Sequence, residues 1–168
     1  MPSFFYKVRI DHSAHSIDLP LPQVNSAMEI TLHTKNLIDN IGALFVKESG
    51  SNDPLPPEGL LIQYLNEANA RLRTIFGRFM EAFFQEHPDN SLGMGDAFVY
   101  RLVLSSRREA NKGQALTDLA HEYLVHSALA KVYTSMSDAQ RASLHEGMAV
   151  SAGQSIDQNL HSKLPPIQ

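Results

Sequence analysis

A heptad-like repeat of apolar residues is the feature that most constrains the fold of this chain. After Pro56 and Pro57, apolar residues recur in alternating steps of four and three: Leu61, Leu65, Ala68, Leu72, Ile75, Phe79 and Ala82. This spacing keeps the apolar side chains on one face of an α-helix. Proline suits the first turn of a helix, where its missing N–H costs nothing, and Pro88 opposes further helix. The sequence therefore predicts a helix over residues 57–87.

Three other stretches also show helical periodicity. Residues 25–46 present one apolar face: Ile30, Leu37, Ile38, Ile41, Leu44 and Phe45. Residues 114–136 are apolar around most of the circumference, which is typical of the central helix of a bundle. In residues 138–162, Ser137 and Gln140 fit a capping box at the start. Apolar residues then recur every fourth position: Leu144, Met148, Ala152, Ile156 and Leu160.

Two short stretches alternate with period two, as half-buried strands do. The first covers residues 4–10 and the second residues 97–104, where Phe98, Tyr100, Leu102 and Leu104 share one side. Two strands so far apart in sequence most simply pair as an antiparallel ribbon lying against the helices. The predicted fold is mainly α: a four-helix bundle with a small two-stranded ribbon, forming one domain over residues 1–168.

Composition excludes several classes of function. The chain has no cysteine, which excludes thiol nucleophiles and zinc sites built from cysteine. Its net charge of −4 argues against a broad nucleic-acid-binding surface. The N-terminus lacks the apolar run of a signal peptide, and no apolar stretch is long enough to span a membrane. We therefore expect a cytoplasmic protein without a membrane segment.

The segment from His121 to His126 resembles a zinc-binding helix motif at first sight, but its spacing is wrong. That motif needs two histidines four residues apart, so that both imidazoles lie on one helix face. Here they are five apart, about 140° around the axis. We interpret His126 as a half-buried hydrogen-bonding residue between Tyr123 and Ala130, and we expect no metal, no cofactor and no catalytic residue. A metal-dependent helical-bundle enzyme using His121 and Glu122 is the alternative.

A cluster of basic residues follows the second predicted strand. Arg107, Arg108 and Lys112 lie in what the sequence predicts to be a polar turn. Three cations contact few phosphates, and no aromatic residue lies among them for base stacking. They are candidate contacts for a protein partner, and a bacterial interaction module that binds an acidic partner through Arg107 and Arg108 is a further alternative.

The segment from Phe98 to Leu104, the basic loop and the helix from Leu119 to Tyr133 resemble one group of proteins. These are small helical proteins encoded among the head, neck and tail genes of Bacteroides-type phages and prophages. The resemblance implies a structural protein, a multi-copy adaptor in a phage head–tail, neck or tail assembly. It implies self-association or binding to other virion proteins, and a location in the host cytoplasm during assembly and then in the virion.

Overall fold

The computed structural model describes residues 25–50, 53–81 and 96–162 of the 168-residue chain. Within these ranges the elements follow the order β1 (Asn25–His33), α1 (Thr34–Ser49), α2 (Glu58–Phe76), β2 (Ala97–Ser105), α4 (Ser106–Ser135) and α5 (Ala139–His161). A short 3-10 helix, Gly77–Phe79, follows α2. The predicted fold class, mainly helical with a two-stranded antiparallel sheet, is confirmed.

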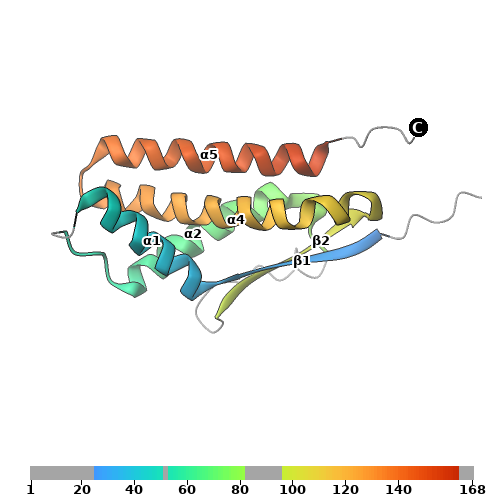
Figure 1. Cartoon of the computed structure of the whole chain (residues 1–168), viewed down its shortest axis with the longest axis horizontal. Helices are drawn as coiled ribbons and strands as arrows, with labels where there is room; N and C mark the ends of the chain where they lie inside the picture. Colours follow the sequence, from blue (N-terminus) through green and yellow to red (C-terminus); the bar gives the residue numbers. More distant parts are fainter. Residues whose placement is uncertain (1–24, 51–52, 82–95, 163–168) are drawn as a thin grey trace, which may run out of the picture.

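Helix α4 is the central element. It packs against the other three helices and against both strands, as its apolar circumference predicts. Figure 1 shows α5 running alongside α4 on one side, with the ribbon of β1 and β2 on the opposite side. The buried apolar side chains of all these elements form one continuous core.

The second predicted strand is confirmed, but its partner is not the one expected. Strand β2 pairs antiparallel with β1, with Asn25 opposite Ser105 and His33 opposite Ala97. Residues 25–33 were predicted as the start of a helix, and that prediction is wrong. Met28, Ile30 and Leu32 are buried while the residues between them are exposed, which is the period-two pattern of a strand. The predicted strand over residues 4–10 lies outside the described residues.

Helix α2 begins after Pro57 as predicted but ends much earlier than Pro88. Gly77 adopts φ 46°, a left-handed conformation that ends helices, and its N–H donates to the carbonyl of Arg73. The chain then runs beside β2, where Met80 bridges to Leu102. The helix predicted beyond residue 76 is therefore wrong as far as Glu81, and residues 82–87 lie outside the described residues.

Helix α4 begins at Ser106, directly after β2, rather than near residue 114. The expected polar turn is thus helical backbone from residue 106 onward, which suits a segment rich in Arg, Glu, Ala and Lys and free of proline. A Cβ atom at Gly113 would lie only 3.3 Å from the sulfur of Met28. Glycine at this position therefore allows α4 to pack closely against β1. The next helix, α5, is capped by Asp138, whose carboxylate accepts the N–H of Arg141 at 3.1 Å. The predicted Ser137 cap is wrong, since Ser137 takes φ 61° in the connecting turn.

The apolar stripe predicted on α5 is only half correct. Its buried residues are His145, Ala149, Ala152, Gly153, Ile156 and Leu160. Leu144 and Met148 are 52% and 42% exposed. A residue four positions on lies about 40° further around a helix, because one turn takes 3.6 residues. Residues at every fourth position therefore drift around the helix and leave the buried face. His145 lies on that face, where Leu144 was expected.

Two glycines of α5 provide a matched test of its packing. A Cβ at Gly153 would lie 3.1 Å from Cδ1 of Ile75 and 3.2 Å from Cε2 of Tyr123, whereas nothing lies within 4 Å at Gly147. We expect Gly153→Leu to lower the free energy of unfolding by about 1–3 kcal/mol through overpacking. Gly147→Ala should raise it by about 0.5–1 kcal/mol through helix propensity. Urea unfolding at low protein concentration measures both, and a neutral Gly153→Leu would contradict this close packing.

Candidate functional site

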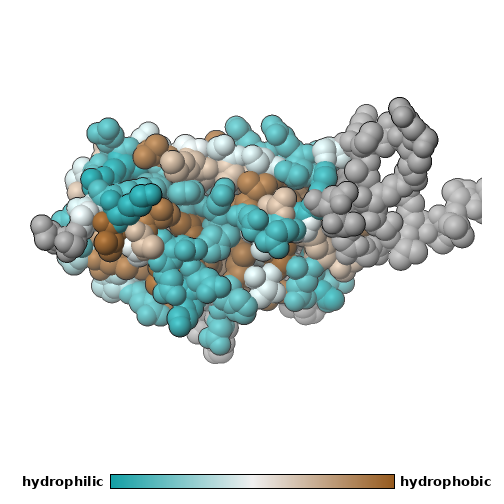
Figure 2. Space-filling model, in the orientation of Figure 1, coloured by the Kyte–Doolittle hydropathy of each residue, from teal (hydrophilic) through white to brown (hydrophobic). Residues whose placement is uncertain are grey.

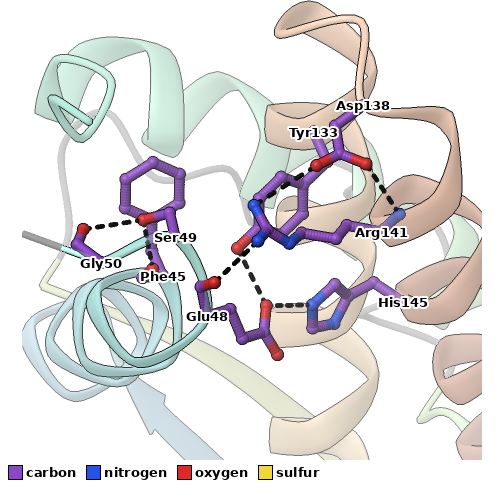
Figure 3. Close-up of polar contacts among 8 residues, drawn as sticks. All are labelled: Phe45, Glu48, Ser49, Gly50, Tyr133, Asp138, Arg141 and His145. Atoms are coloured by element: carbon purple, nitrogen blue, oxygen red, sulfur yellow. Dashed lines mark hydrogen bonds and ion pairs between the residues drawn. The ribbon is translucent and has the colours of Figure 1, made fainter. Parts of the chain in front are cut away.

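A partly buried polar cluster joins α1, α4 and α5, and we call it the Glu48 cluster. Its members are Glu48 from α1, His126 and Tyr133 from α4, and Arg141 and His145 from α5. Figure 3 shows most of it, with Glu48 between Tyr133, Arg141 and His145. His145 is completely buried, which for an imidazole requires hydrogen-bond partners inside the protein.

The Glu48 carboxylate is the shared acceptor of this cluster. Its Oε2 lies 2.8 Å from the hydroxyl of Tyr133 and 2.8 Å from Nε2 of His145. Its backbone carbonyl accepts from Nη2 of Arg141 at 2.8 Å. Burial raises the pKa of Glu48, but the hydrogen bonds from His145 and Tyr133 and the charges of His145 and Arg141 outweigh it, so the net pKa is lowered. Glu48 is therefore ionised at neutral pH.

The ring of Tyr133 holds the cluster together from inside the core. It stacks on Phe45 at 5.7 Å between centroids and on His145 at 5.4 Å, and the guanidinium of Arg141 lies 5.6 Å from its centre. Burial, followed by the hydrogen bond to Glu48, raises the pKa of Tyr133. The hydroxyl thus stays protonated and donates to the carboxylate.

Two histidines face each other next to Glu48. The Nδ1 atoms of His126 and His145 lie 2.9 Å apart, with the rings stacked at 5.1 Å between centroids. Since a hydrogen bond needs one donor and one acceptor, a single proton lies between these nitrogens. Burial and the charge of His145 lower the pKa of His126, against the opposing charges of Glu122 and Glu48. The prediction that His126 is a half-buried hydrogen-bonding residue is confirmed.

A shallow pocket of about 290 Å³ lies between α1 and α4 on the solvent side of His126. His121, Glu122 and His126 all line it, so the fold brings together residues that the sequence separated around the helix. Nε2 of His121 lies 2.7 Å from the amide nitrogen of Asn40, which donates to it. Burial lowers the pKa of His121, despite the charges of Asp118 and Glu122. Both imidazoles are therefore mainly neutral at pH 7.

No group of three or more histidine, aspartate or glutamate side chains suited to a metal ion gathers within residues 25–50, 53–81 and 96–162. The pocket offers two imidazoles, one of which shares its Nδ1 proton with His145. In the same ranges, no helix has the length and apolarity to cross a membrane.

The basic residues proposed as partner contacts occupy the first turns of α4. For Arg107 and Arg108 only the helical backbone is described. Lys112 contacts the end of α5, where its ammonium group donates to the carbonyl of Asn159 at 2.9 Å and to the hydroxyl of Ser162. A cation there complements the negative end of the helix dipole. Lys112 thus holds α4 and α5 together, and contact with a partner stays a prediction for all three residues.

Comparison with known proteins gives no relationship: no protein-family model matches the sequence, and neither a curated protein nor a solved structure is significantly similar to it.

Sequence reasoning did not find Glu48 or His145. Glu48 lies in the last turn of α1, beyond residue 46, where the predicted helix ends. His145 directly follows Leu144, the residue that the predicted stripe places on the buried face. Its spacing of four and seven residues from Ala149 and Ala152 was the available signal, because that spacing places it on the buried face.

Proposed function

We propose that this chain is a structural protein that self-associates through the outer face of α5. The observation that carries the proposal is the exposure of large apolar side chains on this helix. Leu144 and Val150 are each 52% exposed and Met148 is 42% exposed. Figure 2 shows apolar surface over the N-terminal half of α5. Apolar surface of this kind on a helix supports a contact role.

The charge pattern of α5 supports the same conclusion. From Ser143 to Gln154 the only carboxylate or basic side chain is Glu146, apart from the buried His145. A helix face that remains in water normally carries many charges, whereas the cores of protein interfaces are depleted of them. Gly147 and Ser151 lie between Leu144 and Val150 around the helix and keep this face flat enough for close helix packing.

The favoured occupant of this face is a second copy of the chain. A face that is almost uncharged and apolar at both flanks is self-complementary, so two α5 helices related by a two-fold axis can bury it mutually. The Glu48 cluster supports a structural role because its acceptors and donors bind one another across three helices.

Light scattering after size-exclusion chromatography, over a concentration series of the full chain, tests the proposal. We expect the mass to rise above that of the monomer, and Leu144→Glu with Met148→Glu to keep it monomeric. Val46→Glu is the matched control, since Val46 is an exposed valine of α1 and its substitution should leave association unchanged. A monomer at every concentration, or an equal effect of Val46→Glu, would overturn the proposal.

The phage setting is a narrower form of this proposal. The resemblance of the segment from Phe98 to Tyr133 supports a multi-copy adaptor in a head–tail, neck or tail assembly. Co-sedimentation with phage portal and tail proteins is the appropriate measurement. Self-association without such binding would reject the adaptor role and leave the structural role intact.

A further inference from the structure

The first half of α5 is attached to the rest of the protein mainly through the polar contacts of His145 and Arg141. Between residues 139 and 149 its buried side chains are His145 and Ala149, and larger buried apolar side chains come only with Ile156 and Leu160. His145 bonds to α1 through Glu48 and to α4 through His126. Alanine contributes little contact area, so the docking of this half of the helix depends on the bonds of His145, together with the contacts of the partly exposed Arg141 to the carbonyl of Glu48 and to the ring of Tyr133.

The geometry limits how many protons the two imidazoles can hold. Nε2 of His145 carries a proton, because it faces the ionised carboxylate of Glu48. The two Nδ1 atoms, 2.9 Å apart, share one more. Nε2 of His126 can carry a third. A fourth proton would place two N–H groups against each other and give both stacked rings a positive charge.

We propose that His126 and His145 form a pH-sensitive latch, which fastens the first half of α5 to α1 and α4 when they share one proton and opens when both rings become cationic. The proposal is independent of the proposed self-association. His126 is half-buried and lines the pocket between α1 and α4, so protons from solvent reach it directly. His145 is completely buried and contacts His126 through Nδ1.

Charged groups on all three helices act on this pair. Helix α1 contributes the anion Glu48 and, at the pocket, the cation Lys47. Helix α4 contributes Glu122, one turn before His126, together with His121, and α5 contributes Arg141 beside Glu48. The carboxylates favour the cationic rings, whereas burial and mutual repulsion oppose them. The net effect lowers the pKa of His126.

This shift fixes the direction of the pH dependence. A histidine whose folded pKa lies below its unfolded value of 6.5 binds protons more readily in the unfolded state. Stability is therefore complete above that value and is lost as the pH falls below it. The latch is closed at neutral pH and opens in mildly acidic solution.

The experiment is an NMR titration of the full chain in the presence of a chelator, from about pH 7.5 to about pH 5. Nitrogen-15 spectra of the imidazoles report each protonation, and amide exchange, corrected for its intrinsic pH dependence, reports local opening. We expect protection of residues 139–149 to fall about tenfold, because two N–H groups then face each other without an acceptor. Protection around Ile156 and Leu160 should change much less.

His126→Asn is the informative variant, since its amide can donate to Nδ1 of His145 but cannot take up a proton. We expect it to abolish the acid-induced loss of protection. His161→Asn is the matched control: it removes an exposed histidine from the same helix and should behave like the unaltered protein. Protonation of both rings without loss of protection in residues 139–149 would overturn the latch. This measurement uses the unaltered protein, so it tests the proposal even if His126→Asn does not fold. An unchanged acid response in a folded His126→Asn would overturn it as well.

Discussion

Replacement of Tyr100 by alanine is expected to lower the free energy of unfolding by about 3–5 kcal/mol, because it removes a fully buried aromatic ring from the contact between the sheet and α2. The ring lies 5.1 Å from that of Phe76 between centroids, at an angle of 58°. Marginal stability is typical of domains of this size, so a loss of this magnitude removes a large part of it. Guanidinium unfolding followed by circular dichroism measures the change.

Tyr100→Phe separates the hydroxyl group from the ring. The hydroxyl donates to Oδ1 of Asn69 at 2.6 Å, and both residues are buried. Burial raises the pKa of Tyr100 despite the charge of Arg73, so the hydroxyl remains a donor throughout the useful pH range. We expect Tyr100→Phe to cost about 1–2 kcal/mol, clearly less than Tyr100→Ala. Equal losses in the two variants would show that the ring contributes little to this contact.

Removal of the Glu48 carboxylate is the second change with a large expected effect. Glu48→Ala leaves the hydroxyl of Tyr133 and Nε2 of the buried His145 without their acceptor, and we expect a loss of about 3 kcal/mol. Glu67→Ala is the matched control. Glu67 forms an exposed ion pair with Lys131 at 3.4 Å, and losing it should change the free energy of unfolding by less than about 1 kcal/mol. Similar losses in both variants would show that the Glu48 cluster does not stabilise the fold.

Glu48 also contributes its own pH dependence. Because its folded pKa is lowered from 4.5, its contribution to stability is present above that pH and is lost as the pH falls through the folded value. Glu48→Gln should therefore reduce the acid sensitivity of unfolding below about pH 4.5. The latch of His126 and His145 acts in a higher window, below 6.5, so the two effects separate in one series of urea titrations.

Several local elements followed from periodicity because one of their faces is buried. The alternation of Phe98, Tyr100, Leu102 and Leu104 predicted β2, and all four side chains are buried. The heptad-like seam predicted α2 correctly up to Phe76. The prediction failed at Gly77 because an isolated glycine within a helical pattern gives no sign of its φ angle. It failed over residues 25–33 because Ile30 fits both a helical face and a strand that alternates from Met28 to Leu32.

The candidate site was less predictable because its members meet only after the helices have packed. His126 could be identified as half-buried from its place on α4. Its partner His145 lies 19 residues away, and Glu48 lies 97 residues before His145. The spacing of apolar residues specifies which face of each helix is buried. It contains no information on which polar groups come into contact when two helices pack together.

The sequence alone determined that the protein is built from amphipathic helices and a short ribbon, since helical and strand periods are local properties of the chain. The tertiary structure decided that β1 pairs with β2, that Leu144 and Met148 remain exposed, and that Glu48, His126 and His145 form one hydrogen-bonded chain. The physical reason is that hydrogen bonding and burial between distant segments depend on the angle and register at which the elements pack.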